Sequence, residues 1–263
     1  MPDLWGLVWG KPWIDPQRLA EALDQNARPG LDHRTRLLVR DSARALERRW
    51  GPARWAAWLE RSPARPVIEA VRRETLDGTG FPYIEGALME RTEPDTVLQY
   101  LRELGAAARK PAELNIGGAI ALILPGLIER ATQDIDIVDE VPAELREQHG
   151  LLDSLNRAYR LNLTHFQSHF LPSGWESRRH SLGTFGPLRA YRVDEMDIFL
   201  GKLFSKREKD RDDLRLLLPQ LDRAALLRRF AETCGGMWAD PALRAAAELN
   251  WHILTGEALE EAS

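Results

Sequence analysis

The segment that most constrains the fold is DIDIV, residues 134–138, in which acidic and apolar side chains alternate. Alternation with a period of two is typical of a β-strand with one buried face. Ile135 and Ile137 would point to the buried face, and Asp134 and Asp136 would share the other. Two neighbouring carboxylates repel each other and favour a bound cation, and Mg²⁺ prefers oxygen ligands of this kind. The strand therefore predicts a site for Mg²⁺ or Mn²⁺.

Upstream of this strand, NIGGAIALILPGLIE places a pair of glycines between a short strand and an apolar helix. We expect the strand over 114–116 and the helix over 118–124. Gly117 and Gly118 would let the backbone approach a phosphate closely, and the first amides of a helix carry partial positive charge. Taken singly, a Gly-Gly pair is more often a plain turn, and an Asp-x-Asp is more often a solvated strand edge. Their occurrence in this order favours a phosphate-binding turn that faces a metal site.

The rest of the chain predicts helices at both ends and strands in the middle. Helices are expected over 16–25, 32–50, 53–61, 65–74, 92–104, 142–159, 195–218 and 222–233, and from 240 onward. Two further strands are expected over 163–171 (LTHFQSHFL) and 188–194 (LRAYRVD), separated by a loop over 171–180. This order indicates an α+β protein whose small mixed β-sheet core is flanked by an N-terminal helical region and C-terminal helices. We divide it into residues 1–105, 106–220 and 221–263.

Composition and charge limit the class of protein and its compartment. The 263 residues carry a formal net charge of −4, which argues against a broad basic surface for duplex nucleic acid. The single cysteine, Cys234, allows no internal disulfide and favours a reducing compartment. The longest apolar run, AIALILPGLI, is shorter than the roughly 20 residues that span a bilayer, and the N-terminus lacks the pattern of a secretion signal. We expect a cytoplasmic protein with no membrane partner.

The N-terminal region is rich in tryptophan and arginine, and two interpretations of it stay open. Six of the nine tryptophans precede residue 60. Six arginines gather in one predicted helix: Arg34, Arg36, Arg40, Arg44, Arg48 and Arg49. The simpler interpretation is that the tryptophans fill the core between helices, while the arginines form a solvated face with acidic partners such as Asp41 and Glu47. The alternative is a surface that binds RNA.

Residues 115–138 resemble the signature of the nucleotidyltransferase superfamily with the DNA-polymerase-beta-type catalytic core. That signature consists of paired glycines, an apolar helix, often a further glycine, and then Arg-x-Thr-x-Asp-x-Asp. It is matched here, at a spacing about one residue longer than usual, by Gly117, Gly118, Gly126, Arg130, Thr132, Asp134 and Asp136. The similarity is greatest to the bacterial branch that includes abortive-infection and toxin–antitoxin nucleotidyltransferases and uncharacterised relatives.

The resemblance implies specific roles for the matched residues. Residues 106–220 would form a nucleotidyltransferase-like core that uses an NTP as substrate. Asp134 and Asp136 would be catalytic and would bind the metal. Nucleotide-binding roles are implied for Gly117, Gly118, Arg130 and Thr132.

A second match lies downstream, in MDIFLGKLFSKREKDRDDL (residues 196–214). By its residues alone, Lys202 among apolar neighbours either extends along them to water or is directed at an anionic ligand. The segment resembles a helix of the same families that carries a lysine followed by Arg/Lys-Asp-x-x-Asp-Leu, matched by Lys202, Lys209, Asp210, Asp213 and Leu214. The resemblance implies a catalytic and nucleotide-binding role for Lys202 and a functional role for Asp210. Local salt bridges of Asp210 and Asp213 with Lys206, Lys209 or Arg211 are the alternative.

Many active members of the superfamily carry a third acidic residue on a later strand, and this sequence shows no obvious equivalent. The expected strand 163–171 contains no acid, but it would place His165, Gln167 and His169 on one face. A histidine there is either a general base or a hydrogen-bonded residue of the sheet. Asp194, after the next expected strand, is the other candidate.

Two functions are compatible with these residues. The first is a Mg²⁺-dependent nucleotidyltransferase that moves an NMP from an NTP to an unknown acceptor, namely tRNA, a protein or a small molecule. The alternative is a nucleotide-binding or antitoxin-like regulatory module that acts on a cognate protein partner without turnover.

Overall fold

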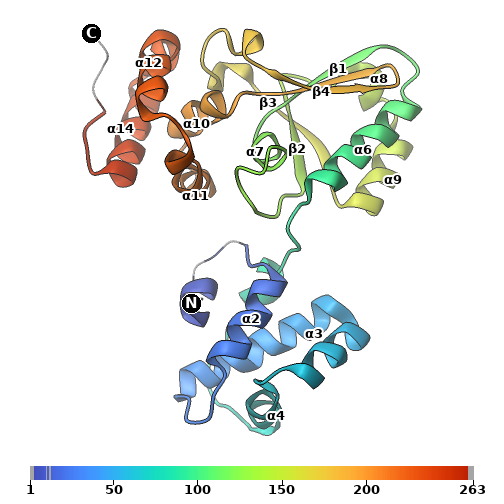
Figure 1. Ribbon diagram of the computed structural model, residues 1–263, viewed down its shortest axis with the longest axis vertical. Coiled ribbons are helices and arrows are strands. Elements are labelled where there is room, and N and C mark those ends of the chain that lie inside the picture. Colours follow the sequence, from blue (N-terminus) through green and yellow to red (C-terminus); the bar gives the residue numbers. More distant parts are fainter. Residues whose placement is uncertain (1–2, 10, 12, 260–263) are drawn as a thin grey trace. The chain divides into compact units, whose positions relative to one another are not determined.

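The computed structural model describes residues 3–9, 11 and 13–259 (Figure 1). The chain divides into two compact units, Met1–Arg91 and Thr92–Ser263, each with its own hydrophobic core. The second unit combines helices with one five-stranded mixed sheet, which confirms the α+β class. The three-part division at residues 105 and 220 stays a prediction. Among the described residues, none of the helices has the length and apolar character needed to cross a bilayer.

The described part of the first unit is built from helices. They are α1 (Leu4–Val8), α2 (Pro16–Asn26), α3 (His33–Arg61), α4 (Arg65–Arg73) and α5 (Tyr83–Ala87). Asp15 and Asp32 cap α2 and α3 by accepting hydrogen bonds from backbone amides of the first turn. The expected break near residue 50 is a kink inside α3, where Gly51 has a φ of 76°. Core packing explains only some of the tryptophans, since Trp55 is buried but Trp9 is 57% exposed.

The second unit is organised around a sheet with strand order β3–β2–β1–β5–β4. The strands are β1 (Ala112–Ile116), β2 (Asp134–Val138), β3 (Asn162–Phe166), β4 (His180–Phe185) and β5 (Leu188–Arg192). β1 pairs antiparallel with β2 and parallel with β5, while β2 is parallel to β3 and β4 is antiparallel to β5. β2 has the bounds that the DIDIV alternation predicts.

Two strand predictions need correction. β3 ends at Phe166, and the following Ser168–Phe170 form a 3-10 turn, η1, so the expected strand over 163–171 is too long and His169 lies outside it. β4 begins at His180, the last residue of the expected loop, and runs through a segment where we predicted no strand. Its segment HSLGTF is largely polar, and an irregularity at Gly183 interrupts its pairing with β5, which hides the alternation.

Helices of the second unit surround the sheet. They are α6 (Pro94–Ala107), α7 (Ile120–Ile123), α8 (Ala143–Arg146), α9 (His149–Tyr159), α10 (Glu195–Leu203), α11 (Glu208–Leu217), α12 (Arg223–Thr233), α13 (Gly235–Trp238) and α14 (Pro241–Thr255), with 3-10 turns η2 (Trp175–Ser177) and η3 (Leu218–Gln220). The expected helices 142–159 and 195–218 are each interrupted, giving α8 and α9, and α10 and α11. Figure 1 shows α6 and α9 packed together, with α10, α11, α12 and α14 grouped elsewhere around the sheet.

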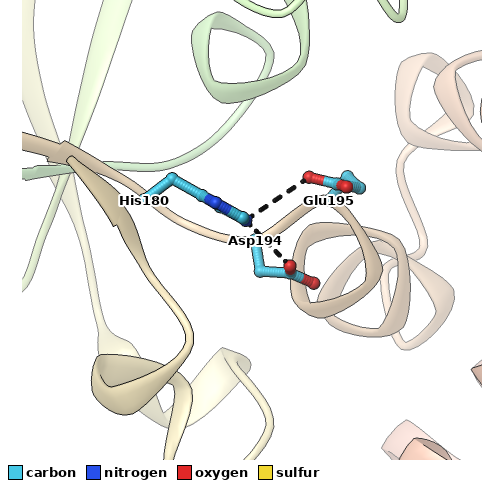
Figure 2. A group of neighbouring side chains, drawn as sticks. All are labelled: His180, Asp194 and Glu195. Atoms are coloured by element: carbon cyan, nitrogen blue, oxygen red, sulfur yellow. Dashed lines mark hydrogen bonds and ion pairs between the residues drawn. The ribbon is translucent and has the colours of Figure 1, made fainter. Parts of the chain in front are cut away.

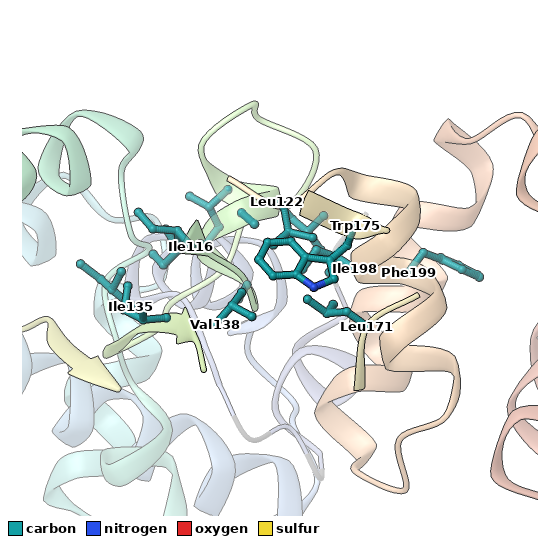
Figure 3. Packing of buried hydrophobic residues seen from close by; sticks show 14 of the residues in the cluster. Ile116, Leu122, Ile135, Val138, Leu171, Trp175, Ile198 and Phe199 are labelled. Carbon is teal, nitrogen blue, oxygen red and sulfur yellow. The ribbon is translucent and has the colours of Figure 1, made fainter. Parts of the chain in front are cut away.

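The core of this unit fixes the segment 115–138. Figure 3 shows Ile116 and Ile135 from the strands in the same cluster as Leu122 from α7 and Ile198 from α10. All four side chains are buried. The same cluster includes the other residues that the sequence assigns to the core, namely Ile120, Ile123 and Ile137. Because both ends of the segment are anchored in one core, the Gly-Gly turn and β2 are held beside each other.

Candidate active site

Asp134 and Asp136 share one face of β2, and both side chains are partly buried. The parallel register places Thr164 of β3 beside Asp136, and the Thr164 hydroxyl donates a hydrogen bond to Asp136 Oδ1 at 2.9 Å. Burial raises the pKa of Asp136, and the charge of Asp134 adds to the rise, although the Thr164 hydrogen bond offsets part of it. Neither aspartate forms an ion pair with any residue that the structure describes. Poorly solvated carboxylates without a partner favour a bound cation.

The paired glycines lie directly against Asp136. The Gly117 amide donates a hydrogen bond to the Asp136 backbone carbonyl at 2.8 Å. Gly118 has a φ of 58°, and a Cβ added there would lie 1.9 Å from Asp136 Oδ2. A Cβ on Gly117 would lie 2.5 Å from the ring of Phe166. Glycine is therefore required at position 118, whereas a side chain at position 117 would have to displace the Phe166 ring. The helix that follows is shorter than expected, because α7 has only four residues.

A cavity of about 420 Å³ is lined by these groups, a volume suited to a small-molecule ligand. One part of its lining is charged and consists of Arg130, Asp134, Asp136, Lys202, Lys206, Arg207, Lys209 and Asp210. Another part is apolar and consists of Phe166, Phe170, Leu171, Ile198, Phe204 and Leu243. The cavity therefore brings together a pair of carboxylates, several basic side chains and an apolar wall.

Lys202 projects from α10 into a buried group of charges. It pairs with Asp210, and its Nζ lies 2.9 Å from Asp213 Oδ2. Burial alone would lower the pKa of Lys202, but the Asp213 and Asp210 carboxylates outweigh it and raise that pKa. The side chain is 13% exposed. Lys202 thus stays charged, but two carboxylates already balance its charge.

Arg130 joins the same group, since its Nη1 lies 2.7 Å from Asp213 Oδ1. Among the described residues, the ion-pair partners of Asp210 and Asp213 are Lys202 and Arg130. The alternative prediction, in which these aspartates pair locally with Lys206, Lys209 or Arg211, is therefore wrong. Burial favours protonation of Asp210, but Lys202 and Ser205 outweigh it and lower the pKa of Asp210. The network connects α10 and α11 to the loop that precedes β2.

Thr132 lines the cavity and supports the start of β2. Its hydroxyl accepts a hydrogen bond from the Asp134 amide at 3.3 Å. Its own amide donates to Thr92 Oγ1 at 2.9 Å, and the Thr92 hydroxyl donates to the Thr132 carbonyl at 3.1 Å. Thr132 thus positions the first residue of β2.

The sequence analysis did not predict that three basic residues downstream of Lys202 line the cavity. Lys206, Arg207 and Lys209 are exposed, and their side chains form no ion pair with any residue that the structure describes. They lie where the chain leaves α10 and begins α11. We predicted one continuous helix over 195–218, and such a helix gives no reason to expect these three side chains in the cavity. The signal was the polar run SKREKD, which follows an apolar helix.

The proposed histidine base is not brought to the carboxylates. His165 is paired in register with Ile137, so it lies on the face of the sheet opposite to Asp136. His165 and Gln167 are exposed, and neither lines the cavity. Thr164 occupies the strand position beside Asp136 where a further acid would complete the site. Asp139, the next acid along the chain, follows the end of β2 with a φ of 63°, and its Oδ1 accepts from the Ser168 amide at 2.8 Å.

Asp194 belongs to a separate cluster with His180 and Glu195 (Figure 2). It caps α10, pairs with Arg229, and lies 3.0 Å from Nε2 of His180. Burial favours protonation of Asp194, but the His180 hydrogen bond and Arg229 outweigh it and lower the pKa of Asp194. Glu195 pairs with Arg192 at 2.8 Å. Because both carboxylates already have cationic partners and neither lines the cavity, the cluster is a structural link between β4, β5 and α12.

The sheet carries two same-face carboxylates on one strand, with a glycine pair packed against them and a cavity rich in basic residues. These features agree with the class of protein that the family comparison shows, the nucleotidyltransferases. The chain belongs to the family described as nucleotidyltransferase of unknown function (DUF6036), and the match covers residues 96–252. No curated protein and no solved structure matches the chain. The matched residues lie within the second unit, and the first unit lies outside the match.

Proposed function

We propose that the protein is a metal-dependent nucleotidyltransferase that moves an NMP from an NTP to an acceptor hydroxyl. The observation that carries this proposal is the cavity shared by Asp134, Asp136 and Gly118 with the basic residues of the α10–α11 junction. Carboxylates suit a divalent cation, a glycine turn suits a phosphate, and lysine and arginine suit the remaining phosphate charge. A nucleoside triphosphate with its metal ion satisfies all three.

Asp134 and Asp136 fit a divalent metal ion such as Mg²⁺ or Mn²⁺. They are carboxylates on one face of one strand, and neither has an ion-pair partner among the described residues. A bound ion would neutralise phosphate charge and would make the acceptor hydroxyl more acidic. Thr164 would hold the Asp136 carboxylate in place through the hydrogen bond to Oδ1.

The remaining residues would bind and orient the triphosphate. The amide of Gly118 would approach the β- and γ-phosphates, while the Gly117 amide stays bonded to the Asp136 carbonyl and holds the turn in place. Lys206, Arg207 and Lys209 would pair with phosphate oxygens. Arg130 and Lys202 would add positive potential while staying bound to Asp213. An acceptor oxygen would attack the α-phosphorus and lose its proton to solvent water. The bond from the α-phosphorus to the oxygen that bridges it to the β-phosphorus would break, and pyrophosphate would leave.

The apolar wall would hold the nucleobase. Phe166, Phe170 and Phe204 offer ring faces and edges, and Leu171, Ile198 and Leu243 complete the surface. The acceptor would be a tRNA, a protein side chain or a small molecule. Membership of the toxin–antitoxin branch would add a cognate protein partner.

The test incubates the protein with each α-labelled NTP, Mg²⁺ and a mixture of tRNA and protein extract. We expect label transfer by the wild type, and loss of at least about two orders of magnitude in Asp134→Asn and Asp136→Asn. Asp153→Asn, on the exposed surface of α9, is the matched control and should transfer label normally. Equal labelling by all four proteins would refute the assignment.

A second function is favoured by one observation, the threonine at position 164. Without a third acid beside Asp136, the same site could bind a nucleotide and regulate a protein partner without turnover. That function predicts that NTP and Mg²⁺ raise the melting temperature while no label is transferred to any acceptor.

A further inference from the structure

The first unit carries a row of arginines along one face of α3. Arg36, Arg40, Arg44 and Arg48 are spaced four residues apart, so they follow one face with a rise of about 6 Å between neighbours. The unit as a whole is basic. Its 91 residues include 15 Lys and Arg and 13 Asp and Glu, whereas residues 92–263 include 21 and 27. The excess of positive charge is therefore confined to this unit.

Part of the row lines a second cavity, of about 310 Å³, which is formed with the loop before α5. Arg40, Arg44 and Arg48 form one side, and the segment 79–82 forms another. Asp41 holds that segment in place, because its Oδ2 accepts from the Phe81 amide at 2.7 Å. The loop also lies close to α3 at Gly80, where a Cβ would be 2.0 Å from the same Asp41 oxygen. The wall of this cavity is therefore fixed by a backbone hydrogen bond and by close packing of the loop on α3.

The two acidic residues of this cavity do not neutralise all of its arginines. Asp41 and Glu85 line it. Asp41 is engaged with Arg40 at 2.9 Å and with the loop amide. Glu85 pairs with Arg48, but the two side chains are 51% and 66% exposed, and an exposed pair of this kind is easily exchanged for another anion. Arg44 is exposed and forms no ion pair with any residue that the structure describes.

An aromatic cluster adjoins this cavity through Phe81, which belongs to both. The ring of Phe81 lies 5.5 Å from Trp5, 6.4 Å from Trp9 and 6.5 Å from Tyr83, measured between centroids. Trp9 is 57% exposed and Tyr83 is 41% exposed, and they are the large apolar side chains of the first unit that reach furthest into solvent. The guanidinium of Arg34 lies 5.1 Å from the Trp9 ring centre.

We propose that the first unit binds single-stranded nucleic acid on the surface formed by the arginine row and this aromatic cluster. Arg44 and Arg48 pair with phosphates, and Trp9 and Tyr83 stack on bases. A basic groove beside exposed aromatic rings is the combination that binds single strands, because every base has a face on which a ring can stack. An acidic protein would use the arginines but would gain little from the exposed rings, so the aromatic cluster favours the nucleic acid.

The experiment measures binding of the full chain to a fluorescently labelled 20-nucleotide oligouridylate, and to the matching oligodeoxyuridylate, by anisotropy at several salt concentrations. Arg44→Glu should weaken binding about tenfold and should reduce the log–log salt slope by about 0.7 for each phosphate that no longer has a cationic partner. Trp9→Ala should weaken binding about tenfold with the slope unchanged, because stacking of a ring on a base releases no counterion. Binding of either strand supports the proposal, and the tighter one identifies the natural class.

The controls distinguish binding at this surface from a general effect of the protein's charge. Arg65→Glu makes the same charge change on α4, where Arg65 pairs with Glu69, and should bind as the wild type does. Circular dichroism confirms that each variant is folded. Equal loss in Arg65→Glu and Arg44→Glu, or competition by polyglutamate as strong as by unlabelled RNA, would overturn the proposal. Asp153→Asn, on the exposed surface of α9 in the second unit, should bind as the wild type does.

Discussion

Gly118 and Gly126 both have a positive φ, 58° and 77°, but only Gly118 lies against a carboxylate. An alanine at either position adopts a left-handed conformation at a cost of roughly 1–2 kcal/mol. A Cβ on Gly126 meets nothing within 4 Å, whereas one on Gly118 would displace Asp136. We expect similar backbone costs for Gly118→Ala and Gly126→Ala, but loss of NTP binding only in Gly118→Ala. Calorimetric unfolding and NTP titration check this, and normal NTP binding by Gly118→Ala would contradict the site.

Asp136 gives a prediction about pH, again at the scale of one residue. Because burial raises its pKa above the ordinary value of 3.8, its ionisation opposes folding. The stability from this group is present below the unfolded pKa and is lost as the pH rises through the folded pKa. Asp136→Asn should therefore melt at a higher temperature than the wild type at pH 7 without metal, with the difference shrinking as the pH falls towards 3.8. A lower melting temperature for Asp136→Asn at pH 7 would contradict this assignment.

At the scale of elements, the junction of α10 and α11 holds both paired and unpaired lysines. Lys202→Met removes the partner of Asp210 inside a buried network and should destabilise the fold by about 3 kcal/mol. Lys206→Met removes an exposed charge and should change stability by less than about 0.5 kcal/mol. Its NTP affinity should nevertheless fall about fivefold. Denaturant melts measure the stability role of Lys202, and NTP titrations measure the binding role of Lys206. A strongly destabilised Lys206→Met would contradict this division.

The elements also show which parts of the fold the sequence could predict. The bounds of β2 follow from DIDIV because the alternation coincides with burial on one face. The break between α10 and α11 was missed because SKREKD is compatible with a helix, and its turn is set by tertiary contacts of Asp210 with Lys202 and Ser205. β4 was missed because its partner β5, rather than its own alternation, makes it a strand.

The same contrast applies to the site. The positions of Asp134, Asp136 and the two glycines could be predicted because each depends only on a local strand or turn, which the spacing of neighbouring residues indicates. The position of His165 on the opposite face depends on the register between β2 and β3, which the sequence does not contain. The placement of Lys206, Arg207 and Lys209 in the cavity lining depends on the bend between α10 and α11, which lies far downstream of β2 in the chain.

At the scale of the whole molecule, the two units have separate cores. We therefore expect residues 92–263 to fold alone and to bind NTP with Mg²⁺ as tightly as the full chain does, within about threefold. Circular dichroism and isothermal titration of the isolated unit check this. Failure of the isolated unit to fold would show that the first unit supplies contacts needed by the second.

Parallel reactions with α-labelled and γ-labelled NTP test the assignment of nucleotidyl transfer most directly. The proposed chemistry transfers the α-phosphorus to the acceptor and releases the γ-phosphorus in pyrophosphate. We predict label on the acceptor from the α-labelled NTP alone, and its loss in Asp134→Asn. Label on the acceptor from the γ-labelled NTP, or transfer undiminished in Asp134→Asn, would contradict nucleotidyl transfer at this site.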